Sequence, residues 1–399
     1  MRQFVLFDPD DNYADLLPLS FTRPLADFRV GILTLRQKWE RRLQGSFCYE
    51  PVEYLMTKYG HCDYDLADQT FILGSLLADD DLARAVDGLK CGEALLKDGT
   101  VLAYRGRKAD LDANLHESAA EYPGEVHILK FPYDIFLNNA REIENDFALL
   151  TAGRKSMPVS KSNTILLPKG KKVTDLLFIE EGAEVECVIL DLREGPVYVG
   201  KDATIMPGVV IKGSLALCQH ATVKMGAKIY GGTTFGPYCK VGGEVSNTVI
   251  FGYSNKAHDG YLGNAVIGEW CNLGAGVNSS NLKNDYSKIR LWNYPRHTFM
   301  RTDLQFCGLI MGDHSKAGIN VMFNTATVVG VGCNLYGAGF PRVFVPSFSA
   351  GSPTAGLSDV SLKKFYEVAE RVMSRRDIPL TEGDRRIYER VYEVASKYK

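Results

Sequence analysis

The residue best placed for acid–base chemistry is His258, in the stretch NKAHDGYLGNAVIGEWCNLGAG (255–276). Asp259 and Gly260 follow it directly. Next come three aliphatic residues, each with a glycine after it: Leu262, Ile267 and Leu273. An imidazole exchanges a proton near neutral pH, so a histidine held by regular structure can serve as a general base. The alternative is a surface-loop histidine without a catalytic task.

A second polar group interrupts the otherwise apolar stretch PLSFTRPLADFRVG (18–31). Arg23, Asp27 and Arg29 stand there among aliphatic and aromatic residues. The planar guanidinium of arginine matches the geometry of a phosphate. A cluster of this kind inside an apolar stretch is hard to explain as solvated surface, so Arg23, Asp27 and Arg29 are candidate substrate-binding residues.

The acid-rich turn FDPDD (7–11) makes Asp8 and Asp10 candidates for a Mg²⁺ site. Ligands of open α/β sheets gather at the carboxyl ends of strands, and this turn follows an apolar run. Acid-rich turns are also common in solvated loops, and this one lacks the threonine of the D-x-D-x-T phosphatase pattern. Both interpretations stay open.

The composition describes a globular protein of two or three domains. Its 399 residues are 45% hydrophobic and 24% charged, which suffices for sizeable cores. The net charge of −2 gives no reason to expect nucleic acid or a membrane as partner. No apolar run approaches the ~18 residues of a membrane helix, and no secretory signal is visible. Nine cysteines without a C-x-x-C pair argue against a zinc ribbon or a disulfide framework and for a reducing cytoplasm.

Residues 1–140 are predicted to form an α/β domain, because apolar strand-like runs alternate with amphipathic stretches. The strand-like runs are FVLF (4–7), FILGSLL (71–77) and VHILKF (126–131), and GILTLRQKWERRL (31–43) is typical of a helix. A helical and polar linker is expected over 141–165, where the helix-like DIFLNNAREIENDFALL (134–150) ends.

From residue 199 large apolar residues recur every six positions. The series is Val199, Ile205, Ile211, Leu217, Val223, Ile229, Phe235 and Val241, and it resumes as Leu262, Ile267 and Leu273 and as Met311, Ala317, Phe323, Val329 and Leu335. A six-residue period is the signature of a parallel β-helix, in which each hexapeptide forms one side of a triangular coil. We expect this β-helix over 166–345. Cys239, Cys271 and Cys333 occupy compact positions of the repeat, so we expect them to pack in the interior.

The last segment, 346–399, is predicted to be a helical tail. Its two amphipathic stretches are LKKFYEVAERVMSRR (362–376) and DRRIYERVYEVASKY (384–398). A solenoid needs its open end covered, so a cap or a subunit contact is the expected role.

The stretch KAHDGYLGNAVIGEWCNLGAG, with VNSSN after it and MGDHSKAGINVMFN further on, resembles the acetyltransferase half of the bifunctional N-acetylglucosamine-1-phosphate uridyltransferase/glucosamine-1-phosphate N-acetyltransferase family. The resemblance covers roughly 249–340. PLSFTRPLADFRVG resembles, more faintly, the P-L-T-x-T-R-P stretch of the sugar-1-phosphate nucleotidyltransferase domain that precedes the β-helix in that family. The resemblance implies a nucleotidyltransferase-like α/β domain followed by a left-handed parallel β-helix.

The same resemblance implies roles for individual residues. His258 would be the general base that removes a proton from the sugar amine as it attacks acetyl-CoA. The backbone N–H of Ala275 would face the developing oxyanion, and Asn281 would orient the acetyl donor and the base. Tyr261 and Asn272 would bind the sugar phosphate. A homotrimer is implied, with each acyl site between neighbouring β-helices.

This sequence departs from the family in its β-helix. Asn247 stands nearest to a phosphate-binding lysine, Ile319 stands where the family has a serine, and the segment around His258 is one residue shorter. An extra loop, 284–306, carries four basic residues: Lys288, Arg290, Arg296 and Arg301. We predict that Lys288 contacts substrate phosphate, against the alternative of a solvated loop.

The N-terminal domain departs further. The turn after the first strand, LFDPDDNYADLLP (6–18), has no glycine, Leu25 replaces the expected lysine, and Ser75 replaces the expected metal aspartate. We expect binding of a sugar phosphate or a nucleoside triphosphate to be retained, with Mg²⁺ required only if transfer chemistry also persists.

The sequence thus predicts a cytoplasmic transferase of nucleotide-sugar biosynthesis that N-acetylates an amino-sugar 1-phosphate with acetyl-CoA. One alternative is a nucleotidyltransferase whose β-helix is purely structural, and another is a non-catalytic assembly or sensor protein. A zinc site of the kind found in γ-carbonic anhydrases is a third possibility, but the histidines at 220, 258, 297 and 314 are far apart in the sequence.

Overall fold

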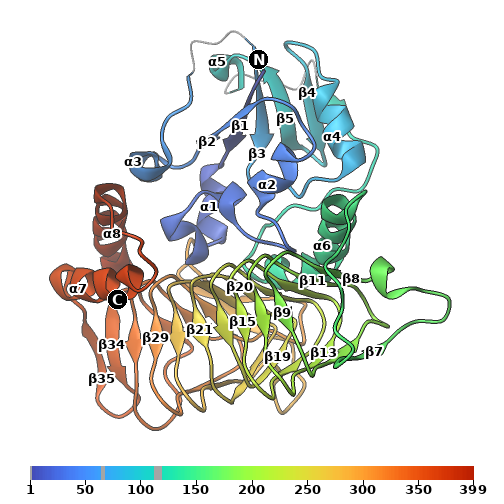
Figure 1. Cartoon of the computed structure of the whole chain (residues 1–399). Helices are drawn as coiled ribbons and strands as arrows, with labels where there is room; N and C mark the ends of the chain where they lie inside the picture. Colours follow the sequence, from blue (N-terminus) through green and yellow to red (C-terminus); the bar gives the residue numbers. More distant parts are fainter. Residues whose placement is uncertain (1, 64–67, 112–118) are drawn as a thin grey trace.

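A computed structural model of the chain describes residues 2–63, 68–111 and 119–399. An α/β domain lies against one side of a long parallel β-helix, and the C-terminal helices cover one end of that solenoid (Figure 1). The fold class predicted from the sequence is confirmed.

The N-terminal domain contains a six-stranded sheet in the order β2-β1-β3-β5-β4-β6. Its strands are β1 (Gln3–Phe7), β2 (Ser46–Glu50), β3 (Gln69–Leu73), β4 (Ala94–Lys97), β5 (Thr100–Gly106) and β6 (Ala119–Glu121). β1 pairs in parallel with β2 and β3, so the carboxyl ends of these three strands lie at one edge. The helices are α1 (Asp10–Asp15), α2 (Leu35–Glu40), α3 (Met56–Tyr59), α4 (Asp80–Asp87), α5 (Lys108–Leu111) and α6 (Tyr133–Thr151), with 3-10 turns η1 (Leu19–Thr22), η2 (Leu25–Asp27) and η3 (Glu53–Leu55).

The predicted strands 4–7 and 71–77 correspond to β1 and β3, and the predicted helix 134–150 corresponds to α6. The strand predicted at 126–131 is wrong, because this segment makes only the isolated bridge Leu76–Ile128. The helix predicted over 31–43 is shorter. Thr34 caps its start by accepting a hydrogen bond from the N–H of Gln37, and it ends at Glu40.

The β-helix consists of three sheets. Sheet 1 contains β7 (Thr164–Leu166), β10 (Ile189–Asp191), β13 (Val210–Lys212), β16 (Lys228–Ile229), β19 (Glu244–Ser246) and β22 (Tyr261–Gly263). Sheet 2 contains β8 (Leu177–Ile179), β11 (Val197–Val199), β14 (Leu215–Leu217), β17 (Thr233–Phe235), β20 (Val249–Gly252), β23 (Val266–Glu269), β28 (Ile310–Met311), β31 (Val328–Val329) and β33 (Phe344–Val345). Sheet 3 contains β9 (Glu184–Val185), β12 (Thr204–Ile205), β15 (Thr222–Val223), β18 (Lys240–Val241), β21 (Asn255–Lys256), β24 (Asn272–Leu273), β29 (Lys316–Ala317), β32 (Asn334–Leu335), β34 (Ser349–Ser352) and the antiparallel β35 (Gly356–Asp359).

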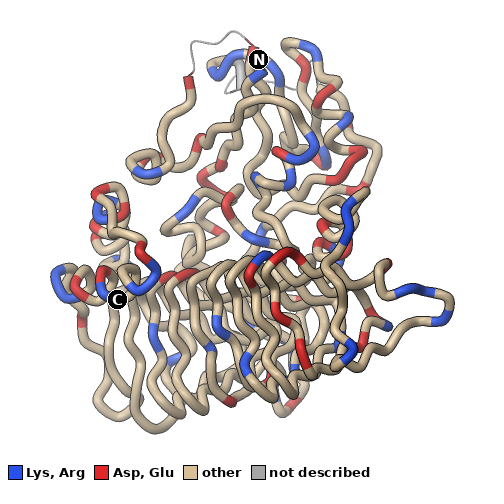
Figure 2. The backbone as a smooth tube through the Cα atoms, in the orientation of Figure 1, with Lys and Arg blue, Asp and Glu red and all other residues tan. Residues whose placement is uncertain are grey.

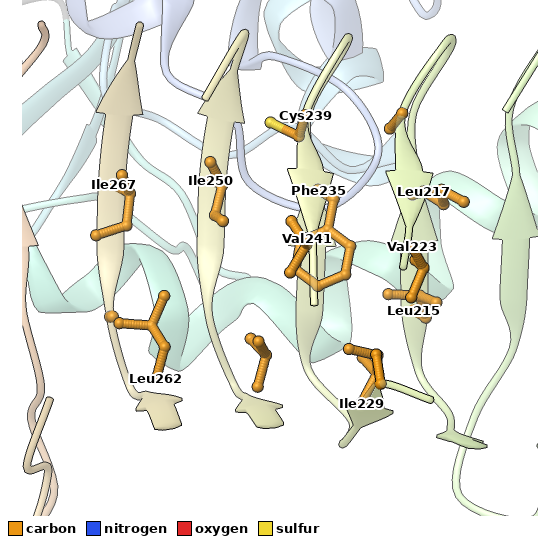
Figure 3. Packing of buried hydrophobic residues seen from close by; sticks show 14 of the residues in the cluster. Leu215, Leu217, Val223, Ile229, Phe235, Cys239, Val241, Ile250, Leu262 and Ile267 are labelled. Carbon is orange, nitrogen blue, oxygen red and sulfur yellow. The ribbon is translucent and has the colours of Figure 1, made fainter. Parts of the chain in front are cut away.

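The hexapeptide ladder forms the interior of this solenoid. All eight residues of the first predicted series are at most 2% exposed and belong to one apolar cluster. Figure 3 shows several of them, among them Leu217, Val223 and Phe235, with side chains directed into the same interior. The packing roles predicted for Cys239, Cys271 and Cys333 are confirmed, since all three are buried in that cluster.

The corners between sheets 2 and 3 carry a column of rings. His220, Tyr238, Tyr253, Trp270 and His314 all have a positive φ between 53° and 61°. Their rings stack on one another along the solenoid axis with centroid separations of 4.3–6.1 Å. Because successive coils repeat the same backbone conformation, each ring is placed over the ring of the preceding coil.

The inserted loop and the tail pack against both domains. The insertion forms a hairpin of β26 (Arg290–Asn293) and β27 (Thr298–Arg301), and β25 (Asn278–Ser279) pairs with β30 (Met322–Phe323). Tyr294 of the hairpin is 1% exposed and contacts Phe21 of the N-terminal domain and Tyr398 of the tail. The tail helices α7 (Leu362–Ser374) and α8 (Glu382–Ala395) confirm the two predicted helices. Phe365 of α7 packs on Phe348 of a terminal coil, as expected of a cap.

The cysteine prediction needs one correction. Cys48 of β2 and Cys62 form a disulfide, and seven cysteines are free, five of them buried. The pairing arises because the chain returns to the edge of β2 within 14 residues and brings the two Cα atoms to 5.6 Å. No helix among residues 2–63, 68–111 and 119–399 is both long and apolar enough to span a membrane.

The inward orientation of the ladder can be tested with Leu217→Ala. Leu217 is fully buried, so its truncation leaves a cavity, and we expect the free energy of unfolding to fall by about 2–5 kcal/mol. The control is Val210→Ala, because Val210 points outward and is 42% exposed. Chemical denaturation followed by circular dichroism measures both variants. Equal losses would contradict the assignment of inward and outward positions.

Candidate functional site

The motif PLSFTRPLADFRVG lies at the contact between the two domains. Arg23 is 4% exposed and points at the β-helix. Its Nη1 lies 3.2 Å from Glu269 Oε1, and its Nη2 donates to Asp313 Oδ2. Thr22 Oγ1 donates to the same Asp313 oxygen at 2.7 Å. Burial alone would raise the pKa of Glu269, but the guanidinium of Arg23 lowers it below its ordinary value.

Two further residues of the motif, Arg29 and Asp27, also form hydrogen bonds within the protein. Arg29 donates from Nε to the carbonyl oxygen of Phe251 at 3.3 Å and from Nη1 to that of Ile32. Asp27 accepts a hydrogen bond from the Tyr49 hydroxyl at 3.3 Å, and its burial raises its pKa. A phosphate would reach Arg23 only after the domains separate. The geometry therefore gives the substrate-binding roles predicted for Arg23, Asp27 and Arg29 no support, and it assigns Arg23 and Arg29 to domain contact.

The predicted Mg²⁺ ligands do not form a site either. Asp8 is 9% exposed, and its Oδ2 accepts the N–H of Leu25 at 3.0 Å. Burial raises the pKa of Asp8 to about 8, which favours the neutral acid and weakens it as a metal ligand. Asp10 is exposed in the first turn of α1. In the described part of the chain, no group of three or more His, Cys, Asp or Glu side chains is arranged to hold a metal ion.

A pocket of about 510 Å³ lies on the outer side of sheet 3, and it contains three of the predicted site residues: His258, Asn272 and Ala275. His258 lies in the exposed turn between β21 and β22, Asn272 is on β24, and Ala275 is in the turn after β24. The regular stacking of coils brings them together, because Asn255 of β21 pairs with Asn272 of the next coil.

The wall of this pocket is basic. Lys240 comes from β18, Lys316 from β29, and Arg375 and Arg376 from the end of α7. No aspartate or glutamate is among the described residues that line it. Burial and the positive charges of Arg376, Lys224 and Arg375 lower the pKa of Lys240. Figure 2 shows basic positions on the solenoid coils next to the C-terminal helices and on those helices. The arrangement favours an anionic ligand.

Apolar and aromatic side chains complete the pocket. Tyr253 and Trp270 of the ring column line it, with ring centroids 4.3 Å apart. Val372 of α7 and Ile319 lie on other sides. Ile319, which stands where the family resemblance predicts a serine, is 69% exposed and thus offers an apolar contact at the pocket.

The remaining predicted residues lie outside this pocket. Tyr261 and Asn281 lie together, since Asn281 Nδ2 donates to the Tyr261 hydroxyl at 2.9 Å and to Asn264 Oδ1 at 2.8 Å. Lys288 donates to the carbonyl oxygen of Asp303 at 2.6 Å, within the inserted loop. The structure therefore divides the predicted site residues into the pocket group, the Tyr261–Asn281 pair and the separate Lys288.

The sequence analysis missed Arg375, Arg376, Lys240, Tyr253 and Trp270. The paired arginines directly follow α7, a helix that the sequence predicts. Their contact with a turn more than a hundred residues away depends on how the tail folds back, which the sequence pattern does not reveal. Tyr253 lies in the region 247–261, where the six-residue period is disturbed.

Comparisons with known proteins agree with this architecture. Residues 4–155 match the model of a family described as sugar nucleotidyl transferase. Over 90 residues the chain is 31% identical to the bifunctional protein GlmU of Methanocaldococcus jannaschii. This aligned stretch covers 23% of this chain and 21% of that protein. It is 32% identical over 118 residues to GlmU of Ruthia magnifica, and the match covers 25% of this chain and 26% of that protein. It is 29% identical over 86 residues to GlmU of Trichodesmium erythraeum, and the match covers 21% of this chain and 18% of that protein.

These matches span only about a fifth to a quarter of the curated relatives. A UDP-N-acetylglucosamine acyltransferase of Francisella novicida is a solved structure similar to this one at 14% identity and a TM-score of 0.28, covering 60% of this chain and 76% of that chain. The family match over residues 4–155 and the three parallel sheets of the solenoid show a nucleotidyltransferase-like domain joined to a β-helix. These matches confirm the predicted resemblance to the GlmU-like family. This chain is a divergent relative, and it matches only part of the length of those proteins.

The domain contact can be tested with Arg23→Met. The change leaves Glu269 and Asp313 without their cation, and breaking a buried ion pair costs about 3–5 kcal/mol. We expect a lower melting temperature and faster proteolysis between the domains. Arg390→Met is the control, because its pair with Glu393 is exposed and contributes less than about 1 kcal/mol. Unchanged proteolysis in Arg23→Met would show that the ion cluster does not hold the domains together.

Proposed function

We propose that this protein is a transferase that moves an acetyl group from acetyl-CoA to the amine of an amino-sugar 1-phosphate in nucleotide-sugar biosynthesis. The observation that carries the proposal is the pocket on sheet 3. It joins His258, Asn272 and Ala275 to a basic wall that includes Arg375 and Arg376. Both proposed substrates carry phosphate groups, and the pocket offers cations without a competing carboxylate among its described lining residues.

In the proposed reaction, His258 accepts a proton from the sugar amine while the amine nitrogen forms a bond to the thioester carbon. The negative charge that develops on the carbonyl oxygen would be stabilised by the backbone N–H of Ala275. Collapse of the tetrahedral intermediate breaks the carbon–sulfur bond, and the proton held by His258 passes to the sulfur, so that coenzyme A leaves as the thiol. Asn272 would orient the sugar phosphate.

The basic residues would bind phosphate from two directions. Lys240 belongs to the solenoid, whereas Arg375 and Arg376 directly follow α7. Arg376 is only partly exposed, and within the described residues neither arginine forms a salt bridge. An arginine without a carboxylate partner is free to bind a phosphate group with two hydrogen bonds.

A homotrimer is part of the proposal. Tyr261 and Asn281, for which substrate roles are predicted, lie on a different side of the solenoid from the pocket of their own chain. In a trimer of parallel β-helices, the Tyr261–Asn281 pair of one chain would complete the pocket of a neighbour. Acetyl-CoA as co-substrate would place the protein in the cytoplasm.

For the N-terminal domain we propose an assembly role rather than nucleotidyl transfer. Arg23 and Arg29 contact the β-helix, and burial raises the pKa of Asp8 to about 8, which weakens it as a metal ligand. We therefore expect no release of pyrophosphate from a nucleoside triphosphate and a sugar 1-phosphate with Mg²⁺ present. Release at a rate typical of enzymes would instead favour a nucleotidyltransferase with a structural β-helix.

The role of His258 can be tested with His258→Ala. Purified protein is incubated with acetyl-CoA and glucosamine 1-phosphate, and free thiol is followed. We expect turnover by the wild type and a loss of about 100-fold or more in the variant, which is typical for removal of a general base. His220→Ala is the matched control, because His220 occupies an exposed corner of the same solenoid outside the pocket.

Two outcomes of that assay would contradict the proposal. Equal turnover of wild type and His258→Ala would reject this residue as the base. Absence of turnover by a folded wild-type protein would reject glucosamine 1-phosphate as the acceptor.

The basic wall can be tested with Arg376→Ala. Loss of a charge-assisted hydrogen bond to phosphate costs about 1.5–3 kcal/mol, so we expect KM for acetyl-CoA or for the sugar phosphate to rise about 10- to 100-fold. Arg371→Ala is the control, because Arg371 is exposed on the same helix and lies 3.9 Å from Glu367. Steady-state kinetics with each substrate varied in turn identify which phosphate is bound. Unchanged KM values for both substrates would remove Arg376 from the site.

A further inference from the structure

A lysine occupies an inward position of the solenoid. On sheet 3, Ile205 pairs with Val223, Val223 with Val241, and Val241 with Lys256. The three aliphatic residues belong to the interior cluster, so Lys256 stands where the repeat otherwise has an apolar side chain. Its side chain is 0% exposed.

The ammonium group of Lys256 has a defined partner. Its Nζ donates to the backbone carbonyl oxygen of His258 at 2.5 Å. Burial lowers the pKa of Lys256 to about 8, although the nearby carboxylate of Asp259 favours the charged form. An apolar residue at this position would avoid the cost of burying an ammonium group. A lysine in such a place is therefore better explained by what it holds than by stability.

The group that it holds is the turn carrying His258. This turn bulges outward, with His258 and Asp259 both exposed. Each of its three carbonyl groups has a donor: Lys256 Nζ binds that of His258, the N–H of Gly276 binds that of Asp259 at 3.0 Å, and the N–H of Glu244 binds that of Gly260 at 3.2 Å. The latter two donors are backbone groups of neighbouring coils. Only His258 is held by a side chain from the interior.

The turn also has little freedom to shift. Gly260 has a φ of +124°, and a Cβ atom there would lie 2.1 Å from the carbonyl oxygen of Val277. The backbone is thus pressed against the next coil immediately after His258. Lys256 fixes the opposite end of the same short segment.

We propose that Lys256 is a positioning residue for His258, holding the backbone of the exposed turn from inside the solenoid so that the imidazole stays at the pocket. The kinetic consequence rests on the proposed function, whereas the restraint on the ring does not. Lys256 does not touch the substrate, and it acts only through the His258 carbonyl group.

The test is Lys256→Met, which keeps the length and apolar part of the side chain and removes the ammonium group. Nuclear magnetic resonance of ¹⁵N-labelled histidine rings reports the mobility of the His258 imidazole, with its signal assigned by its disappearance in His258→Gln. We expect the variant to fold with an unchanged or higher melting temperature and a His258 ring that becomes mobile on the nanosecond timescale.

Ser315→Ala is the control for the ring signal. Ser315 is fully buried in the solenoid and its Oγ donates to the carbonyl oxygen of Gly330 at 2.6 Å, but it is not among the described residues that line the pocket. We expect this change to leave the His258 ring signal as in the wild type. Equal effects of Lys256→Met and Ser315→Ala on the ring would overturn the proposal, because they would show a general loosening of the solenoid.

Kinetics provide the second measurement. In Lys256→Met we expect kcat for acetyl transfer to fall about 10- to 100-fold with KM within about twofold, because a displaced base slows the chemical step without weakening binding. An unchanged kcat together with an unchanged His258 ring signal overturns the proposal. If the wild type shows no acetyl transfer, the proposed function fails, and the ring mobility alone still decides whether Lys256 positions His258.

Lys256→Gln covers the case in which the methionine variant does not fold. Glutamine retains an N–H donor of similar direction without the charge, and we expect partial restoration of the ring signal. Failure of both variants to fold would make Lys256 a structural residue of the solenoid and overturn the positioning role.

Discussion

Arg23 is 4% exposed, so its charged guanidinium is buried. A buried guanidinium is tolerated only when anions and hydrogen-bond acceptors surround it. Glu269, the last residue of β23, and Asp313, which follows β28, supply those anions. Asp313 is held in turn by Thr22 and by the N–H of Glu269. The buried ion cluster therefore connects the N-terminal domain to the solenoid at a defined place. The tail helix α8 packs beside the same contact, where Lys58 pairs with Asp384.

This constraint extends to the pocket. The α7 helix packs on the terminal coils and on α8, and the residues that directly follow it, Arg375 and Arg376, line the pocket beside His258. The arginines of the basic wall thus lie in a tail that also contacts the N-terminal domain, through α8 and α3. The motif PLSFTRPLADFRVG resembles a nucleotidyltransferase site in sequence, but here it joins the N-terminal domain to the β-helix. The proposed chemistry takes place on the β-helix.

The fold could be predicted from the sequence where one rule is repeated many times. Eight large apolar residues at six-residue intervals are typical of a parallel β-helix, so the coils and the burial of Cys239 follow from the period. The grouping of His258, Asn272 and Ala275 follows from the same repetition, since stacked coils align equivalent turns.

The role of Arg23 could not be predicted in this way. A buried arginine looks the same in the sequence whether its anion is a substrate phosphate or Asp313, and the choice is made by a contact 290 residues away. Lys256 was overlooked because it lies where the period is disturbed.

The ring column gives the molecule an optical property. Trp270 is 7% exposed, stacks on Tyr253 at 4.3 Å and faces His314 at 6.1 Å, and it also lines the pocket. His314 in turn contacts Tyr388 of α8. The indole therefore senses the pocket on one side and the packing of the tail on the other. Its fluorescence reports on the pocket and on the tail without a label, once the emission of Trp39 and Trp292 is removed by substitution.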